Sequence, residues 1–169
     1  YKLSQHFRNL KDDQILELKK VGGLIGLNPY PFFIDNSFSM NALSEDVPLI
    51  EKAKQRAREV VNAYSVEDRF QILTNEFEGR HQRLVSKEDA LALIDEVKTT
   101  PSVKEISKAL TRQLQALNTS KIENKTAYLI SDFQKNISDF QNFSKSNNNK
   151  FSCYFLGVSR SRNSSIWFL

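Results

Sequence analysis

The stretch PFFID at residues 31–35 decides the fold, because it is a short run of aromatic and β-branched residues that ends in a carboxylate. A run of this kind is typical of a buried β-strand. Two serines follow at alternate positions, so that residues 35–39 read Asp-Asn-Ser-Phe-Ser. Asp35, Ser37 and Ser39 therefore supply one carboxylate and two hydroxyl groups directly after a buried strand.

Outward from this stretch, strand-like and helix-like segments alternate along the chain. Apolar residues spaced by three and four predict helices, at residues 47–64, 86–98 and 134–143 and from Pro101 or Ser102 to Leu117. Short runs rich in β-branched and aromatic residues predict further strands, at residues 68–77, 125–133 and 151–158 and from Ser165 onward. The polar segment after Gly79 predicts a short strand at the edge of the sheet, where charged side chains block unwanted pairing.

The alternation predicts an α/β fold that is doubly wound, with a mainly parallel central sheet, helices on both faces and one short antiparallel edge strand. Residues 27–169 form this domain. Residues 1–26 form a separate flank, which is either helical or a linker. Because the chain begins without Met and ends on an apolar, strand-like stretch, we expect a fragment of a longer protein that is cut within the domain at its C-terminus.

Composition narrows the class of protein. The 169 residues are 40% hydrophobic and 26% charged, as in an ordinary globular domain, and no run approaches the roughly 18 apolar residues of a membrane span. The net charge of +4 is spread among acidic residues rather than clustered with aromatic ones, which argues against a nucleic-acid partner. The single cysteine, Cys153, lies in an apolar run and is expected to be a small buried thiol.

A second predicted strand also ends in a carboxylate, because YLISD at residues 128–132 places Asp132 after an apolar run. In a parallel sheet the carboxyl ends of the strands meet at one edge, where such folds bind their ligands. Thr100 or Ser102, in the loop before a predicted helix, could add a further hydroxyl. Carboxylate and hydroxyl oxygens are the ligands that Mg²⁺ or Mn²⁺ prefers, and such an ion could bridge to a carboxylate of a partner protein.

Each of these residues also has a purely structural interpretation. Ser37 and Ser39 could cap a helix or stabilise a loop, and Ser102 could cap the helix that follows it. Asp132 could belong to a turn at the end of its strand. The sequence alone leaves these interpretations open.

An enzyme on a similar sheet is the alternative function, in the form of a metal-dependent hydrolase or phosphotransfer enzyme. A phosphotransfer site of the haloacid-dehalogenase kind needs a second acid two residues after the first, and here that position is Ser37. A receiver domain needs an adjacent pair of acids, and only Asp35 is visible. The chain also lacks Gly-x-Ser-x-Gly and a glycine-rich first turn, so we expect a binding module and not an enzyme.

The segments IDNSFSM, AKQRAREVV, DRFQILTNEFEGRHQRLVSKE, YLISDFQKN and SIWF resemble the von Willebrand factor type A-like domain of aerotolerance-regulator (BatA-type) proteins of the Bacteroidetes. The resemblance covers about residues 32–169. It implies a metal-ion-dependent adhesion site, in which Asp35, Ser37 and Ser39 match the first motif and Asp132 matches the later aspartate. Residues 99–102, Thr-Thr-Pro-Ser, depart from the Gly-Gly-Thr of that family, so that either Thr100 or Ser102 would fill the threonine position.

The same resemblance implies a function and a location. It implies a protein–protein interaction module within an envelope complex. It also implies an anchor in the inner membrane, through segments outside this chain, and a domain that faces the periplasm.

Overall fold

A computed structural model describes residues 29–118, 125–134, 139, 152–159 and 166–168. The interpretation of residues 1–26 therefore lies outside the described residues, as does most of the helix predicted at 134–143. The main sheet has five strands in the order β4-β1-β5-β6-β7. Their bounds are β1 Pro29–Ile34, β4 Arg69–Thr74, β5 Thr126–Ser131, β6 Ser152–Gly157 and β7 Ile166–Phe168.

The sheet is mainly parallel, as the sequence predicts. Strands β4, β1, β5 and β6 run in one direction, and only β7, paired with β6, runs the other way. All six residues of β1 are buried. This matches the position of β1 between two neighbouring strands, with helices over both faces of the sheet.

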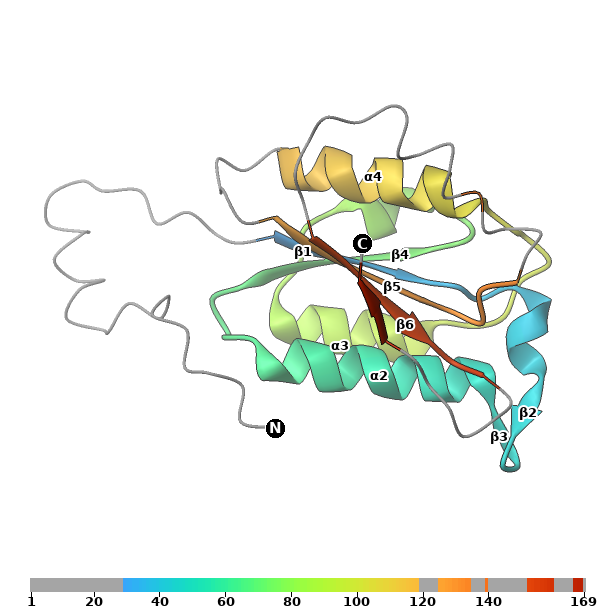
Figure 1. The fold of residues 1–169 in the computed structure, drawn as a ribbon. Coiled ribbons are helices and arrows are strands. Elements are labelled where there is room, and N and C mark those ends of the chain that lie inside the picture. The colour runs from blue at the N-terminus through green and yellow to red at the C-terminus, as the bar shows by residue number, and fades with distance from the viewer. Residues whose placement is uncertain (1–28, 119–124, 135–138, 140–151, 160–165, 169) are drawn as a thin grey trace, which may run out of the picture.

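Helices cover both faces of the sheet (Figure 1). Helices α2, Leu49–Ala63, and α3, Lys87–Glu96, pack together on one face, and α4, Ile106–Asn118, lies on the other. Alternation along the strands divides the core accordingly: Phe32 and Ile34 face α2 and α3, whereas Phe33 packs with α4. The chain is therefore an α/β protein with one sheet between two helical layers.

The register of the strands places their carboxyl ends level with one another. Ile34 of β1 pairs with Thr74 of β4 and with Ile130 of β5. The residues that follow these three are Asp35, Asn75 and Ser131, so they meet at the same edge. From β1 the chain first builds β4 on one side and later β5 on the other, and this change of direction is where open α/β sheets form ligand sites.

The predicted edge strand after Gly79 is wrong in form. Residues Gly79–Gln82 form a 3₁₀ helix, η2, and the only strand-like pairing described there is a single antiparallel bridge between Phe70 and Val85. One bridge leaves β4 at the edge of the sheet. The antiparallel edge strand of the structure is β7, on the opposite side.

Two helices begin later in the structure than the sequence predicts. Val47 and Pro48 form strand β3, which pairs with β2, Leu43–Ser44, in a small hairpin, so α2 begins at Leu49. Helix α4 begins at Ile106, later than the apolar pattern indicates. Ser86 caps α3, because its side chain accepts a hydrogen bond from the backbone N–H of Asp89.

Candidate metal site at the carboxyl edge

Asp35 is the centre of a buried hydrogen-bond network, with 1% of its surface exposed. Its Oδ1 accepts bonds from the backbone N–H of Ser37 at 2.9 Å and from Nδ2 of Asn75 at 2.7 Å. Its Oδ2 accepts a bond from the hydroxyl of Ser131 at 2.7 Å. Three donors thus stabilise the buried charge, and Oδ2 keeps one lone pair for a further partner.

The two serine hydroxyls lie side by side. Ser37 Oγ and Ser39 Oγ form a hydrogen bond with each other at 3.0 Å, and the backbone of Ser37 forms a parallel bridge with that of Thr100. The N–H of Thr100 also donates to the carbonyl of Asn36 at 2.8 Å. The fold therefore brings together the loop after β1 and the loop before α4, which are more than sixty residues apart in sequence.

These contacts bear on the structural interpretations of the serines. Ser37 is the N-cap residue of the 3₁₀ helix η1, Phe38–Asn41, but its side chain makes no capping hydrogen bond. Ser102 does not cap α4, because the helix begins four residues later, so that interpretation is wrong. The backbone N–H of Ser102 instead donates to the Thr100 hydroxyl at 3.3 Å.

Asp132 follows the strand residue that binds Asp35. Its Oδ2 accepts a bond from Gln134 at 3.1 Å, whereas its Oδ1 is buried with no hydrogen-bond partner among the described residues. A buried carboxylate oxygen without a partner is costly. This oxygen is therefore available to a cation or to an ordered water molecule.

Three polar residues of the network were missed from the sequence: Asn36, Asn75 and Ser131. Asn36 donates from Nδ2 to the carbonyl of Lys98 at 2.7 Å and accepts the N–H of Asn75 at 3.0 Å. A signal was present, since each of the three lies at or just after the carboxyl end of an apolar strand. The rule that selected Asp35 and Asp132 would have selected them too, had amides and the last strand residue been included.

The donor set fits a small divalent cation. Two neighbouring ligands of an octahedral ion with bonds of about 2.1 Å lie about 3.0 Å apart, which is the spacing of the two serine hydroxyls. Among the described residues no three His, Cys, Asp or Glu side chains gather into a metal-binding group. The contacts bring together Asp35, Ser37, Ser39 and the backbone of Thr100, whereas no described contact joins the Asp132 carboxylate to them.

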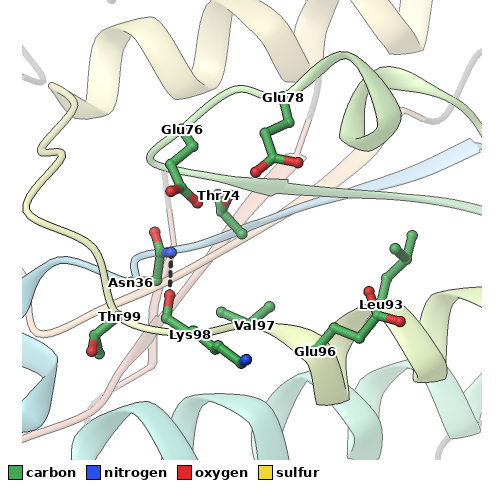
Figure 2. Close-up of a pocket in the computed structure, with 9 residues that line it drawn as sticks. All are labelled: Asn36, Thr74, Glu76, Glu78, Leu93, Glu96, Val97, Lys98 and Thr99. Atoms are coloured by element: carbon green, nitrogen blue, oxygen red, sulfur yellow. Dashed lines mark hydrogen bonds between the residues drawn. The ribbon is translucent and has the colours of Figure 1, made fainter.

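A cavity of about 420 Å³ adjoins this network at the carboxyl end of β4. Figure 2 shows Glu76 and Glu78 from the loop after β4 on one side and Glu96 from α3 on another, with Asn36 joined to the backbone of Lys98. Three carboxylates against one ammonium group make the cavity favourable for positive charge. The cavity and the candidate metal site share Asn36.

Cys153 lies apart from the site, on β6 against the α4 side of the core. It is a free, buried thiol, as predicted. Burial raises the pKa of this thiol to about 12, so that it stays protonated and unreactive near neutral pH. Its role in the described structure is to fill space in the core.

Comparison with known proteins supports the fold and is silent on the site. No protein-family model matches the sequence, and no curated protein matches it either. A solved structure described as the "D319A mutant of the PilB minor pilin from Streptococcus sanguinis" is similar with a TM-score of 0.51 and 11% sequence identity. The match covers 64% of this chain and 30% of that pilin, so the chain spans less than a third of its length. At this identity the likeness shows the α/β fold alone.

No helix within the described ranges is long and apolar enough to span a membrane.

Proposed function

We propose that this chain is a von Willebrand factor type A-like domain, and that it binds partner proteins through a metal-ion-dependent adhesion site. The metal would be Mg²⁺ or Mn²⁺, held by Ser37, Ser39 and Thr100 with Asp35 and Asp132 around them. When bound, such an ion offers an open coordination position to a carboxylate of the partner. The domain acts as a binding module and not as an enzyme.

One observation carries this proposal. Ser37 Oγ and Ser39 Oγ bond to each other at 3.0 Å, the backbone of Ser37 bridges to Thr100 and donates to the buried carboxylate of Asp35, and Ser37 makes no capping bond. A purely structural pair of hydroxyls would be expected to bond to backbone groups nearby. Two hydroxyls that bond to each other instead keep free lone pairs on adjacent oxygen atoms.

Asp132 gives independent support. Its buried Oδ1 has no hydrogen-bond partner among the described residues, and it follows the serine that donates to Asp35. A cation, directly or through a water molecule, would satisfy this oxygen. Ser102, the alternative for the threonine position, instead approaches Thr100 through its backbone, which favours Thr100 as the ligand.

The test is a titration of the chain with Mg²⁺ and Mn²⁺, followed by calorimetry and by thermal melting. We expect millimolar or tighter binding to the wild type and none to Asp35→Ala or to the double variant Ser37→Ala with Ser39→Ala. Ser44→Ala is the matched control, because Ser44 lies in the following hairpin and bonds to Lys52 instead. A wild type that gives neither heat nor a melting shift would end this proposal.

The setting that we propose is an envelope complex at the inner membrane, with this domain on the periplasmic side and its anchor in segments outside this chain. The resemblance to BatA-type proteins supports this setting. Protease treatment of intact spheroplasts tests it. Cleavage of the domain is expected, and protection would place it in the cytoplasm instead.

A further inference from the structure

Asn75, the first residue after β4, connects the candidate metal site to a second loop. It is 1% exposed. Its Nδ2 donates to Asp35 Oδ1 at 2.7 Å, and its Oδ1 accepts the backbone N–H of Lys104 at 3.0 Å. One side chain therefore bonds both to the buried carboxylate and to the segment that links Thr100 to helix α4.

The chemistry of these two bonds requires an amide. Asp35 Oδ1 needs a donor, and the N–H of Lys104 needs an acceptor, at the two ends of one short side chain. Asparagine supplies both, whereas an aspartate at this position would supply acceptors only. Leucine has the same shape and supplies neither.

The backbone of Asn75 adds a third tie. Its N–H donates to Asn36 Oδ1 at 3.0 Å, and Asn36 in turn binds the carbonyl of Lys98 at 2.7 Å. Lys98 and Lys104 bracket the loop that contains Thr100. The loop is thus held near both of its ends by two amides that belong to the strand ends around Asp35.

We propose that Asn75 is the positioning residue of the candidate metal site. It orients Asp35, so that the remaining lone pair of Oδ2 faces a cation or its water, and it holds the Thr100 loop against Ser37. This inference rests on the proposed metal site and adds to it a residue that touches no metal. Groups that orient metal ligands in this way typically change metal affinity by about 10- to 100-fold.

The first experiment titrates Mn²⁺ into the wild type and into Asn75→Ala, with the melting temperature measured in EDTA. We expect the Mn²⁺ affinity of Asn75→Ala to fall at least tenfold. The matched control is Gln113→Ala, because Gln113 is also a buried amide with two bonds, to the carbonyls of Pro31 and Tyr128 within the sheet. This control should lower the melting temperature in EDTA while leaving Mn²⁺ affinity within twofold of the wild type.

The second experiment uses Asn75→Asp, which keeps the acceptor for Lys104 but sets a second carboxylate beside Asp35. Two carboxylates in contact repel each other unless a cation or proton lies between them. We expect a lower melting temperature than the wild type in EDTA and a smaller rise on addition of Mn²⁺, because an aspartate cannot donate to Asp35 and so does not orient it. A merely structural asparagine would give the lower melting temperature with a rise on addition of Mn²⁺ equal to that of the wild type.

The outcomes separate the two proposals. A wild type that binds no Mn²⁺ overturns the metal site and this inference together. A wild type that binds, with Asn75→Ala and Gln113→Ala equally close to it in affinity, overturns only the role of Asn75. If Asn75→Ala does not fold, the response of Asn75→Asp to Mn²⁺ decides, and a response as large as that of the wild type counts against the inference.

Discussion

The two ends of the central sheet differ in what holds them together. At the carboxyl edge, polar groups dominate, with Asp35 and its three donors at their centre. In the half of the sheet where the parallel strands begin, packed aromatic rings on the α2 and α3 face hold the structure together. Tyr30 lies 3.9 Å from Tyr64 between ring centroids, and Tyr128 lies 4.8 Å from Phe32. One end is built for orientation and the other for apolar burial.

Backbone geometry differs in the same way. Four described residues other than glycine have positive φ: Phe77 and Phe133 lie in the loops after β4 and β5, and Glu45 and Asp46 form the turn of the small β2–β3 hairpin. Residues other than glycine adopt this conformation at a cost of about 1–2 kcal/mol. Strain of this kind tends to be kept at functional sites. We therefore expect the aromatic half to contribute more to the stability of the sheet than the carboxyl edge does.

The largest expected effect comes from breaking the aromatic half. Phe32 is fully buried and stacks on Tyr128. We expect Phe32→Ala to lower the free energy of unfolding by about 3–5 kcal/mol, through lost burial and the cavity that remains. Urea denaturation measures this value. A loss below that of Ser131→Ala would contradict the division of roles between the two ends.

At the polar edge, the corresponding change is Ser131→Ala. The Ser131 hydroxyl donates to Asp35 Oδ2 and accepts the N–H of Phe133 at 3.0 Å. Its removal leaves a buried carboxylate oxygen and an N–H without these bonds, so we expect a loss of about 2–3 kcal/mol. Ser44→Ala, measured alongside by urea denaturation, should lose less than half as much, because its partner Lys52 is partly exposed.

The tyrosine pair predicts how the aromatic half responds to alkaline pH. The hydroxyls of Tyr64 and Tyr128 are 2.5 Å apart, and burial raises the pKa of both, that of Tyr128 to about 12. The folded chain therefore keeps these protons at a pH where the unfolded chain releases them. This contribution to stability is complete below about pH 10 and is lost as the pH rises toward 12.

Tyr128→Phe tests this dependence. By about pH 11 the wild type should have lost about 1 kcal/mol more than Tyr128→Phe, relative to each protein at pH 8. Urea denaturation at several pH values gives the comparison. Parallel curves for the two proteins would show that the pair does not titrate as its burial implies.

The smallest expected effect is a gain. Glu45 and Asp46 form the two-residue turn between β2 and β3, with φ of 55° and 61°, which is the conformation that favours Asn-Gly. Asp46→Gly should raise the free energy of unfolding by about 0.5–1 kcal/mol, because glycine adopts positive φ without strain. Asp46→Ala keeps the β-carbon and should give no gain in thermal melting.

Prediction from sequence worked where the signal was local. The apolar run that ends in Asp35 predicts a buried strand, and Ser86 followed by Asp89 indicates the start of a helix. Both signals depend on neighbouring residues only. The start of α4 could not be predicted in this way. The N–H of Lys104 is bound by Asn75 from another strand, and a tertiary contact of this kind is invisible to helical periodicity.

Tertiary contacts also limit what the sequence can predict about the edge of the sheet and about the candidate site. Whether residues 79–86 form a strand depends on how they pair with the edge of β4. Among the described residues of this segment, only Val85 pairs with it, through Phe70. The candidate ligands Asp35, Ser37, Ser39 and Asp132 follow from strand ends, but the sequence alone does not show that the backbone of Thr100 pairs with Ser37. The sequence motif identifies residues with suitable oxygen atoms, whereas the register of β1, β4 and β5 determines which strand ends lie side by side.

The three hydrogen-bond donors around Asp35 have a consequence for how fast the proposed metal site could exchange its ion. A carboxylate held by fixed hydrogen bonds keeps its place with or without a cation, so that loading the proposed site would not require the domain to fold again. Attachment and release would then follow the exchange of an ion and its water molecules. A contact made in this way could be undone within the lifetime of a single protein molecule, leaving the domain ready for another partner.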